Sequence, residues 1–435
     1  MSKGKYSAQN FQAWFSKKSD NGFSGQELVV GIDVSKIAFY AAVMSGGWRD
    51  FDVLYFERDD IPAFIARLSK LDFAGVTLVL EPTGTYGDAL LDQAREAGFK
   101  LIRVSGSDTH KAKALFDGVP SMHDGKAAYT LARLYLCGVG NQWKLRCDAD
   151  RDLRALDDQA AHLQKMEGQL VNPLEAHLAR HWPEVTDYLD LKSATLLELL
   201  KTYGSPQEVA AHKKKARALM KKVGGHFLCP DKIEAVLRSA ESTIGVSPTV
   251  FQIELLQYYA TMLRTHMKRS AVLNRRIEEL SRQDERLKNL ADWAGKRTAL
   301  AMVARVGDFT AYEAPQGLEN GFGLTLCEHT TGQTHQDRSG DHLGLHISKR
   351  GPGRPRGLLF MMVLRMISPV TSIYCPIATA WYAERLERNG GIKKKALVAL
   401  MRKVVRALFW VARGATYDPE KLFDTRRLRR LGHLI

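Results

Sequence analysis

Two apolar runs near the start of the chain each end on a carboxylate, and this pattern constrains the fold more than any other feature. Residues 28–32 lead into Asp33, and residues 76–80 lead into Glu81. Each run is short and almost wholly apolar, as expected of a strand that is buried in a sheet. We therefore predict two buried strands, each followed by an acidic side chain.

The segments around these two runs predict an α/β fold. A Ser-Gly-Gly turn at 45–47 separates two further apolar runs and indicates a hairpin. The additional elements that we predict are strands at 37–44, 48–56 and 100–104 and helices at 61–71 and 87–97. Hairpin strands followed by alternating helices and strands are typical of a mixed sheet.

The rest of the chain is predicted to be mainly helical. Residues 153–178 and 250–290 have apolar side chains at three- and four-residue steps, and we favour two helices packing on each other over an intermolecular coiled coil. The second stripe comprises Leu255, Tyr259, Met262, Leu273, Ile277, Leu280 and Leu287. Between them, the lysine runs at 213–215 and 221–222 are either a solvated helix face or a nucleic-acid contact.

These changes in pattern divide the chain into four predicted segments. They are an N-terminal arm at 1–26, the α/β domain at 27–145, a helical, coiled-coil-like region with a basic insertion at 146–290, and a mainly helical C-terminal domain at 291–435. Near the start of the last segment, glycines at short turns expose backbone N–H groups that can hold a phosphate.

Charge points to a polyanionic partner. The 435 residues carry a formal net charge of +15, and from Lys349 onward 19 Lys and Arg oppose 5 Asp and Glu, which is 19 − 5 = +14 of that total. Each cation placed on a phosphate releases a counterion, so such a segment favours nucleic acid. The candidate contacts are Lys349, Arg350, Arg354, Arg356, Lys393, Lys394, Lys395, Arg402 and Arg406.

Cysteine usage and hydropathy suggest a compartment. The 5 cysteines are widely spaced without a CxxC pair, which fits a reducing environment rather than a disulfide framework. The N-terminus has no apolar signal region, and no apolar run is long enough to span a membrane. We expect a soluble protein of the bacterial cytoplasm with no membrane partner.

Three acidic residues are candidates for a metal site. Carboxylates at the ends of adjacent strands can converge, so Asp33 and Glu81 are expected to lie close together. Asp124 precedes a predicted helix and could supply a third oxygen, or could simply cap that helix. Such an all-oxygen set suits Mg²⁺, which would leave room for water and a substrate phosphate.

The motifs around these acids resemble those of DEDD-type insertion-sequence transposases, the bridge-RNA-guided recombinases. The strings are GIDVSK from Gly31, EPTGTYG from Glu81, and HDGKAA from His123. In the C-terminal half, VGD at 306–308, Gly-Leu at 323–324 and ISKRGP at 347–352 resemble the second transposase domain of that family. The resemblance covers about 27–140 and 290–410. It implies an RNase H-like, RuvC-like fold for the α/β domain, with Asp33, Glu81 and Asp124 as three of four Mg²⁺ ligands.

The fourth acidic position of the family motif falls on Ala127, three residues after Asp124. A methyl group cannot bind a metal. Either the chain works with three acids, or a working Asp was replaced and the enzyme is inactive. The local string DGKAAYTLA favours the second alternative.

The resemblance also implies a serine nucleophile in the second transposase domain. Ser339 stands in a Ser-Gly at a suitable distance before Ile347, and counting forward from Gly323 selects Thr331 instead. Serine is the less hindered nucleophile, so Ser339 is the first choice. The same loop holds Cys327, His329, His335, His342 and His346, but their spacing matches no standard zinc site.

The sequence therefore predicts a DNA transposase, a site-specific recombinase that cuts and rejoins donor and target duplexes. The resemblance further implies a structured guide RNA and a dimer or tetramer whose active sites combine two subunits. Two other hypotheses are a RuvC-like structure-specific nuclease and a non-catalytic nucleic-acid-binding derivative, for which Ala127 is the best argument.

Overall fold

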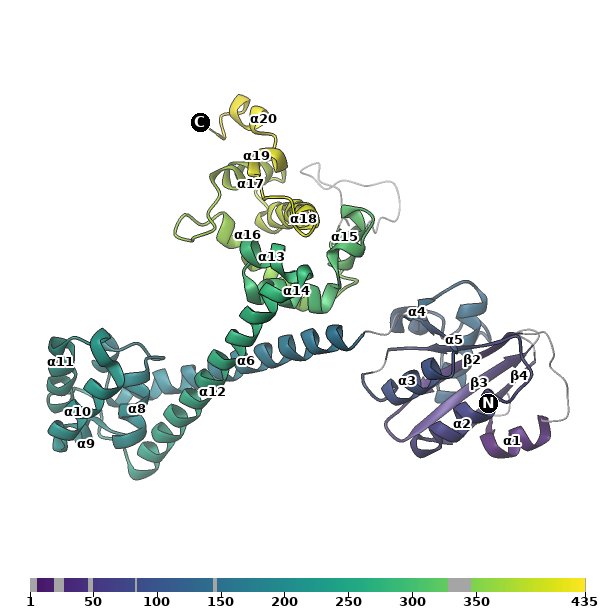
Figure 1. The fold of residues 1–435 in the computed structure, drawn as a ribbon, viewed down its shortest axis with the longest axis horizontal. Helices are drawn as coiled ribbons and strands as arrows, with labels where there is room; N and C mark the ends of the chain where they lie inside the picture. The colour runs from purple at the N-terminus through teal and green to yellow at the C-terminus, as the bar shows by residue number, and fades with distance from the viewer. Residues whose placement is uncertain are drawn as a thin grey trace. The chain divides into compact units, whose positions relative to one another are not determined.

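The computed structural model describes residues 6–18, 27–45, 50–82, 84–143, 147–327 and 346–434. The chain divides into two compact units, Met1–Leu145 and Arg146–Ile435. The first contains the sheet, and the second is almost entirely helical (Figure 1). The predicted α/β region and helical remainder are both confirmed.

The first unit is built on a mixed sheet with the order β1-β4-β3-β2-β5-β6-β7 among the described residues. Its strands are β1 (Ala8–Asn10), β2 (Glu27–Val34), β3 (Ala38–Ser45), β4 (Phe51–Glu57), β5 (Gly75–Leu80), β6 (Lys100–Arg103) and β7 (Asn141–Gln142). Strands β2, β3 and β4 form an antiparallel meander. Strand β5 pairs in parallel with β2, and β6 pairs in parallel with β5. Parallel neighbours need a crossover connection, and here a helix precedes each of the two strands.

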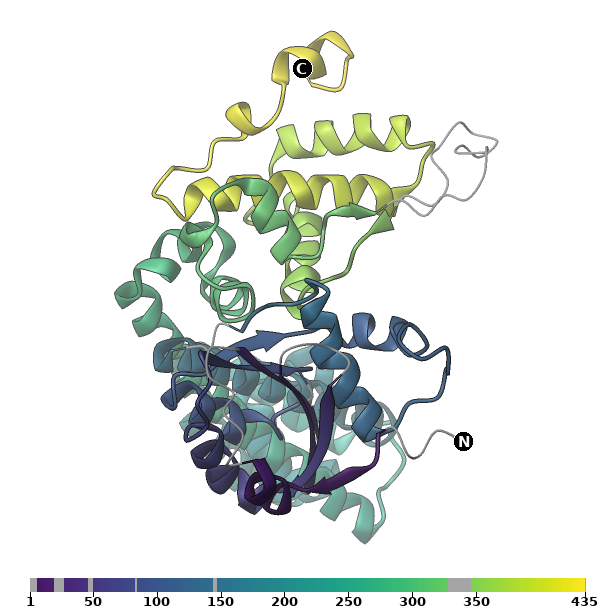
Figure 2. The same ribbon diagram turned by 90° about the vertical axis from the view of Figure 1, so that its right-hand side faces the viewer.

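Helices cover both faces of this sheet (Figure 2). They are α1 (Phe11–Lys18), α2 (Ile61–Leu68), α3 (Asp88–Glu96), α4 (Gly106–Lys111) and α5 (Asp124–Leu136). Strand residues alternate between two cores, since successive side chains point to opposite faces. On β2, Leu28, Val30 and Ile32 join the core with α1, α2 and α3. Val29 joins the core with α5.

The predicted N-terminal arm is partly folded onto the sheet, which corrects the prediction. Within it, β1 pairs in parallel with β4, and α1 buries Phe11, Trp14 and Phe15. The indole of Trp14 donates a hydrogen bond to Asp52 at 2.7 Å. The segment is too short and too mixed in composition for periodicity to reveal it.

The second unit contains two long helices, α6 (Asp148–His181) and α12 (Val250–Gln283), which pack on each other as predicted. They run in opposite directions (Figure 1). Between them lie α7 (Val185–Tyr188), α8 (Ala194–Tyr203), α9 (Pro206–Ala211), α10 (Lys213–Gly224), η2 (Gly225–Phe227) and α11 (Pro230–Glu241). We call this segment, residues 184–249, the helical lobe.

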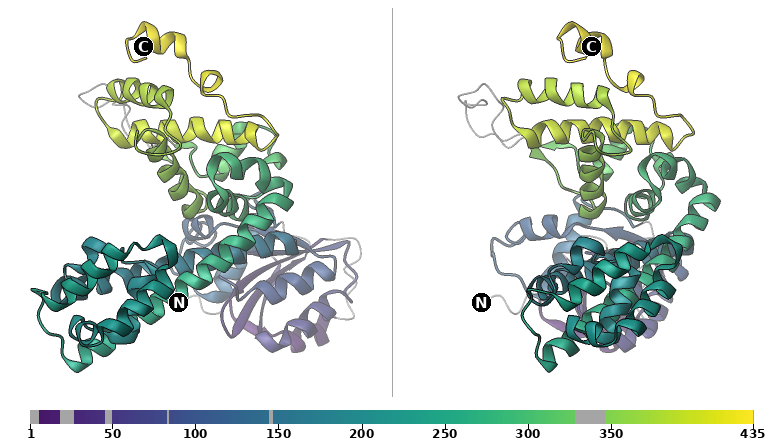
Figure 3. Two further views of the ribbon diagram at one scale, coloured as in Figure 1. Left: turned by 60° about the vertical axis from the view of Figure 1, so that its left-hand side comes forward. Right: turned by 90° about the vertical axis from the view of Figure 1, so that its left-hand side faces the viewer.

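The rest of the second unit is a helical bundle with a small hairpin. Its elements are α13 (Glu285–Ala294), α14 (Lys296–Val306), η3 (Phe309–Ala311), α15 (Pro315–Gly321), β8 (Leu326–Cys327), β9 (His346–Ile347), α16 (Gly353–Met366), α17 (Pro376–Arg388), α18 (Lys393–Val411), α19 (Pro419–Leu422) and α20 (Thr425–Arg430). Figure 3 shows this bundle and the helical lobe from two further sides. The lobe and the bundle have separate hydrophobic cores, and α6 and α12 contribute to both.

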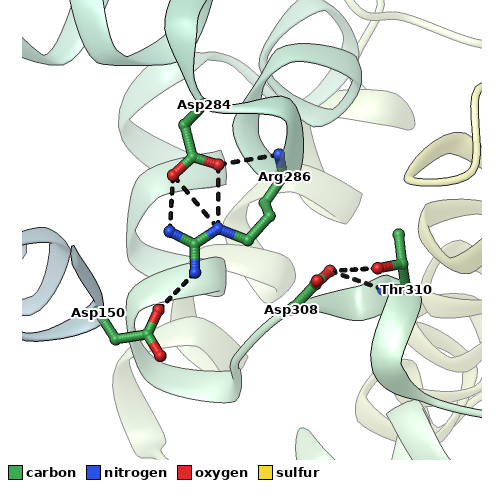
Figure 4. A network of polar contacts seen from close by, with 5 residues as sticks. All are labelled: Asp150, Asp284, Arg286, Asp308 and Thr310. Carbon is green, nitrogen blue, oxygen red and sulfur yellow. Dashed lines mark hydrogen bonds and ion pairs between the residues drawn. The ribbon is translucent and has the colours of Figure 1, made fainter. Parts of the chain in front are cut away.

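The predicted helical pattern at 250–290 is two helices, because the chain turns at Asp284. The Asp284 carboxylate accepts a hydrogen bond from the backbone N–H of Arg286 at 2.9 Å and so caps α13. The Arg286 guanidinium bonds both Asp284 and Asp150, which ties the start of α6 to this turn (Figure 4). The same figure shows Asp308 capping η3 through Thr310.

The predicted stripe on α12 is displaced by one residue in its first half. There Leu256, Ala260 and Leu263 are buried, while Leu255 is exposed. In the second half Leu273 and Ile277 are buried as predicted. The difference arises because the first half of α12 packs into the lobe core and the second half into the bundle core. Among the helices described, none is long and apolar enough to cross a membrane.

Candidate active site

Asp33 and Glu81 stand next to each other at the carboxyl edge of the sheet. Strands β2 and β5 are parallel, and Ile32 pairs with Leu80, so the next residue on each strand is an acid. The pleat that places Val29 and Val79 in the core with α5 also directs Asp33 and Glu81 toward the α5 face. The two carboxylates therefore share one edge and one face.

Asp124 reaches the same face from the first turn of α5. The residue that caps this helix is His123, whose Nδ1 accepts the Lys126 N–H at 3.4 Å. The alternative role of Asp124 as the cap is therefore wrong. Asp124 is left exposed, and its carboxylate is not used to satisfy the helix.

The charges of Glu81 and Asp124 both act on Asp33. The pKa of Asp33 is raised to about 6, first by burial and then by the negative charges of Asp124 and Glu81. Within the described ranges, no three His, Cys, Asp or Glu side chains converge tightly enough to hold a metal ion. The mutual repulsion of these carboxylates is what a bound divalent cation would relieve. Carboxylate oxygens are the donors that Mg²⁺ prefers, so the chemistry of these side chains, though not their present spacing, matches the predicted ion.

Ala127 lies one turn after Asp124 on α5 and is half-buried. Residues three apart on a helix are neighbours on its surface, so an Asp at this position would extend the acidic set. In the predicted set of four acids, Ala127 therefore leaves the fourth position without an oxygen donor.

A buried ion pair fixes the start of α5. The ammonium of Lys126 bonds the Asp117 carboxylate at 2.8 Å and the Val119 carbonyl at 2.6 Å. The side chains of Lys126 and Asp117 are 3% and 9% exposed. The Tyr6 hydroxyl donates to the same carboxylate at 3.0 Å. Sequence reasoning missed this support, because the partners are far apart along the chain and a single Lys gives no pattern.

Two glycines allow the close approach of the acidic elements. A Cβ on Gly31 would lie 2.1 Å from the Ala128 carbonyl oxygen, so β2 and α5 pack backbone against backbone. A Cβ on Gly106 would lie 2.4 Å from Oε1 of Glu81. The Glu81 carboxylate therefore rests against the first residue of α4. The strings GID and SGSD contain these glycines, but sequence alone could not tell what each one faces.

Gly106→Ala is expected to weaken metal binding without weakening the fold. The added methyl must displace the Glu81 carboxylate, which is the end of a flexible side chain, whereas Ala is the better helix former by up to about 1 kcal/mol. In the Ala127→Asp chain we expect at least roughly tenfold weaker Mn²⁺ binding, similar to the loss of a residue that orients a ligand. Mn²⁺ titration with a thermal melt measures both effects.

The matched control for this variant is Gly75→Ala on β5, where an added Cβ meets nothing within 4 Å. It should bind Mn²⁺ as the unsubstituted chain does. Equal affinity in the Gly106→Ala and Gly75→Ala chains would mean that Gly106 does not position Glu81.

Both candidate nucleophiles, Ser339 and Thr331, lie outside the described residues, as do His329, His335 and His342. The two ends of that segment are held together by the β8–β9 hairpin, in which Cys327 pairs with His346. Next to it, the Lys349 N–H donates to the Gly323 carbonyl at 3.0 Å, with Lys349 at φ 53. A left-handed non-glycine residue marks a constrained backbone beside this hairpin.

At least five of the nine candidate nucleic-acid contacts interact with other residues of the chain, and Lys395 is one of them. Arg402 and Arg406 bond the two oxygens of buried Glu319 at 2.8 and 2.7 Å. Arg354 bonds buried Asp157 at 2.8 Å, and Arg356 donates to the Phe322 carbonyl. These arginines hold the bundle together. Lys349, Arg350, Lys393 and Lys394 are exposed.

Family models match both parts of the chain. A DEDD-type transposase model named for IS110 matches residues 30–183. A second model, described as the transposase IS116/IS110/IS902 family, matches residues 294–374. Together they cover more than half of the chain and include Asp33, Glu81, Asp124 and the segment that bears both candidate hydroxyls. No curated protein matches the chain. Transposases of this kind act on DNA, and the chain belongs to the IS110 family of DEDD-type transposases.

Proposed function

We propose that this transposase cuts and rejoins DNA with a Mg²⁺-dependent acidic site and a serine nucleophile. Asp33, Glu81 and Asp124 would hold the ion, and Ser339, or else Thr331, would attack the phosphate. The observation that carries the proposal is the placement of Asp33 and Glu81 at the ends of two adjacent parallel strands, where the charges of Glu81 and Asp124 both act on Asp33. In this proposal residues 27–145 are a RuvC-like domain and 291–435 a transposase domain with the nucleophile loop, joined by the helical region 146–290.

The proposed chemistry conserves the energy of the broken bond. The Ser339 hydroxyl loses its proton as Oγ forms an ester to the scissile phosphorus, the bond from phosphorus to one sugar oxygen breaks, and that sugar oxygen takes up a proton in turn. When bound, Mg²⁺ would supply positive charge for the phosphate and the leaving oxygen. The strand can later be rejoined by attack of a new sugar hydroxyl on the phosphoserine ester, without ATP.

The partners belong to the same proposal. A structured guide RNA and a dimer or tetramer with composite active sites would select and join two DNA duplexes. The exposed Lys349, Arg350, Lys393 and Lys394 would contact phosphates. Ala127 favours a second candidate, a chain that binds nucleic acid but does not cut it. A RuvC-like nuclease that uses water is a third, and it requires no loop hydroxyl.

The test is a covalent adduct between protein and DNA. The Ala127→Asp chain is expected to form an adduct that survives denaturation, and adding Ser339→Ala should remove both the adduct and strand exchange while metal binding persists. The Thr331→Ala chain is the matched control. Loss of the adduct with Thr331→Ala alone would assign the nucleophile to Thr331. Free DNA ends without an adduct in any of these chains would contradict the recombinase proposal.

A further inference from the structure

The helical lobe lies outside both segments that the transposase models match. Its core, to which α6 and α12 also contribute, buries Leu196, Met220 and Val236 almost completely. A separately packed segment inserted between α6 and α12 is therefore available for a function beyond the acidic site and the nucleophile loop.

One face of α10 is a stripe of exposed lysines: Lys214, Lys215, Lys221 and Lys222. The two pairs are seven residues apart, which is two helical turns and about 10 Å along the axis. The opposite face buries Ala216 and Met220. We call these four residues the lysine stripe.

The neighbouring cations on α10 are neutralised, but the stripe is not. Lys213 pairs with Glu241, and Arg217 forms two hydrogen bonds with Glu234 at 2.7 and 2.8 Å. Both acids belong to α11. Within residues 147–327, the four stripe lysines have no hydrogen bond or ion pair. Four like charges on one face, without counter-charges, favour an anionic partner.

An aromatic pair projects at the end of the same helix. In η2, directly after α10, the rings of His226 and Phe227 have centroids 4.2 Å apart. Phe227 is 89% exposed, although the next residue, Leu228, packs against the lobe core. A phenylalanine ring that is left in water forgoes the favourable free energy of burial. A ring in this position offers a flat apolar face to a partner.

We propose that the lysine stripe and Phe227 bind a single-stranded nucleic acid. The lysines would contact successive phosphates, and one unpaired base would stack on the Phe227 ring. Backbone-tracking cations combined with an exposed aromatic platform are how proteins hold single strands without reading sequence. A duplex would offer phosphates but no free base face. A protein partner fits less well, because lysines are depleted from protein interfaces.

The experiment is photocrosslinking of the full-length chain to short oligonucleotides that carry one 5-iodouracil. This base crosslinks to an aromatic ring on which it stacks, and mass spectrometry then identifies the peptide. Three probes are compared: single-stranded RNA, single-stranded DNA, and a duplex with the same modified base. We expect a crosslink at Phe227 with a single strand and at least fivefold less with the duplex. The RNA and DNA probes show which strand is the source.

Two variants and one matched control test the residues. Phe227→Leu keeps an apolar side chain but should abolish the crosslink. Lys221→Gln/Lys222→Gln should reduce its yield and lower the slope of binding against log salt by about 1.4, at roughly 0.7 per phosphate. Lys165→Gln/Lys268→Gln removes the same charge from exposed positions on α6 and α12 and should leave the Phe227 crosslink unchanged.

Several results would overturn the proposal. They are the absence of a crosslink in peptides of the helical lobe, equal crosslinking to the duplex, and equal loss in both lysine double variants. A change in oligomeric state on Phe227→Leu, without a change in crosslinking, would assign the ring to a protein interface instead. None of these outcomes depends on Ala127, so they leave the proposal for the acidic site unaffected.

Discussion

Asp33→Asn in the Ala127→Asp chain is expected to abolish DNA cleavage while the fold is retained. The amide matches the carboxylate in shape but lacks the charge that a hard divalent cation requires. Asp33 is central because both other acids act on it. We expect Glu81→Gln and Asp124→Asn to have the same effect. The cleavage rate should fall by more than roughly 100-fold in each variant. Removing a residue that only hydrogen-bonds a metal ligand already costs up to about that much, and these variants remove a ligand itself.

The measurement is cleavage of labelled duplex DNA with Mg²⁺, together with a thermal melt of each variant. The matched control is Asp72→Asn, an exposed acid in the connection before β5, which should cut as the Ala127→Asp chain does. Nucleic-acid binding should persist in all of these variants. Cleavage by all three acid variants would contradict the assignment of the site.

Gly31→Ala is expected to destabilise the first unit strongly. A Cβ there would lie 2.1 Å from the Ala128 carbonyl oxygen and 2.6 Å from the Ala132 nitrogen, and backbone atoms cannot rotate away as a side chain can. Overpacking of this kind costs about 3 kcal/mol. For a unit of about 150 residues, that corresponds to a fall in Tm of roughly 6–12 °C. The displaced α5 would also carry Asp124 away from Asp33.

Gly75→Ala again provides the control, since it adds the same methyl group to the neighbouring strand, in open space. Thermal unfolding followed by circular dichroism compares the two variants. A Tm for Gly31→Ala within about 2 °C of the Gly75→Ala value would show that β2 and α5 do not depend on this contact.

The sequence predicted the acidic elements because their signals are local. Two apolar runs, one ending at Asp33 and one at Glu81, predict two buried strands. They also predict that both acids lie where those strands end. Strand order and pleat then bring the two acids together. The helix that starts at Asp124 was predictable for the same reason, although its cap proved to be His123.

The residues that support the site were not predictable, since their partners are distant. The pairing of Lys126 with Asp117 and the contact of Gly106 with Glu81 depend on how whole elements pack. In the sequence, Arg402 and Arg406 look like part of a basic, solvent-exposed helix face. In the structure both bond Glu319, which lies about eighty residues earlier in the chain. The folded part of the arm was missed because Phe11 and Trp14 become buried only when β1 pairs with β4, and this pairing is not visible in the local sequence.

Mn²⁺ binding tests the central claim most directly, because Mn²⁺ occupies the same oxygen sites as Mg²⁺ and its free ion can be counted by electron paramagnetic resonance. The Ala127→Asp chain is expected to bind Mn²⁺ more tightly than the chain with Ala127. Adding Asp33→Asn, Glu81→Gln or Asp124→Asn should each remove that gain, whereas Asp72→Asn should not. Equal Mn²⁺ binding in all of these chains would contradict a metal site at the edge of the sheet, and with it the proposed mechanism of DNA cleavage.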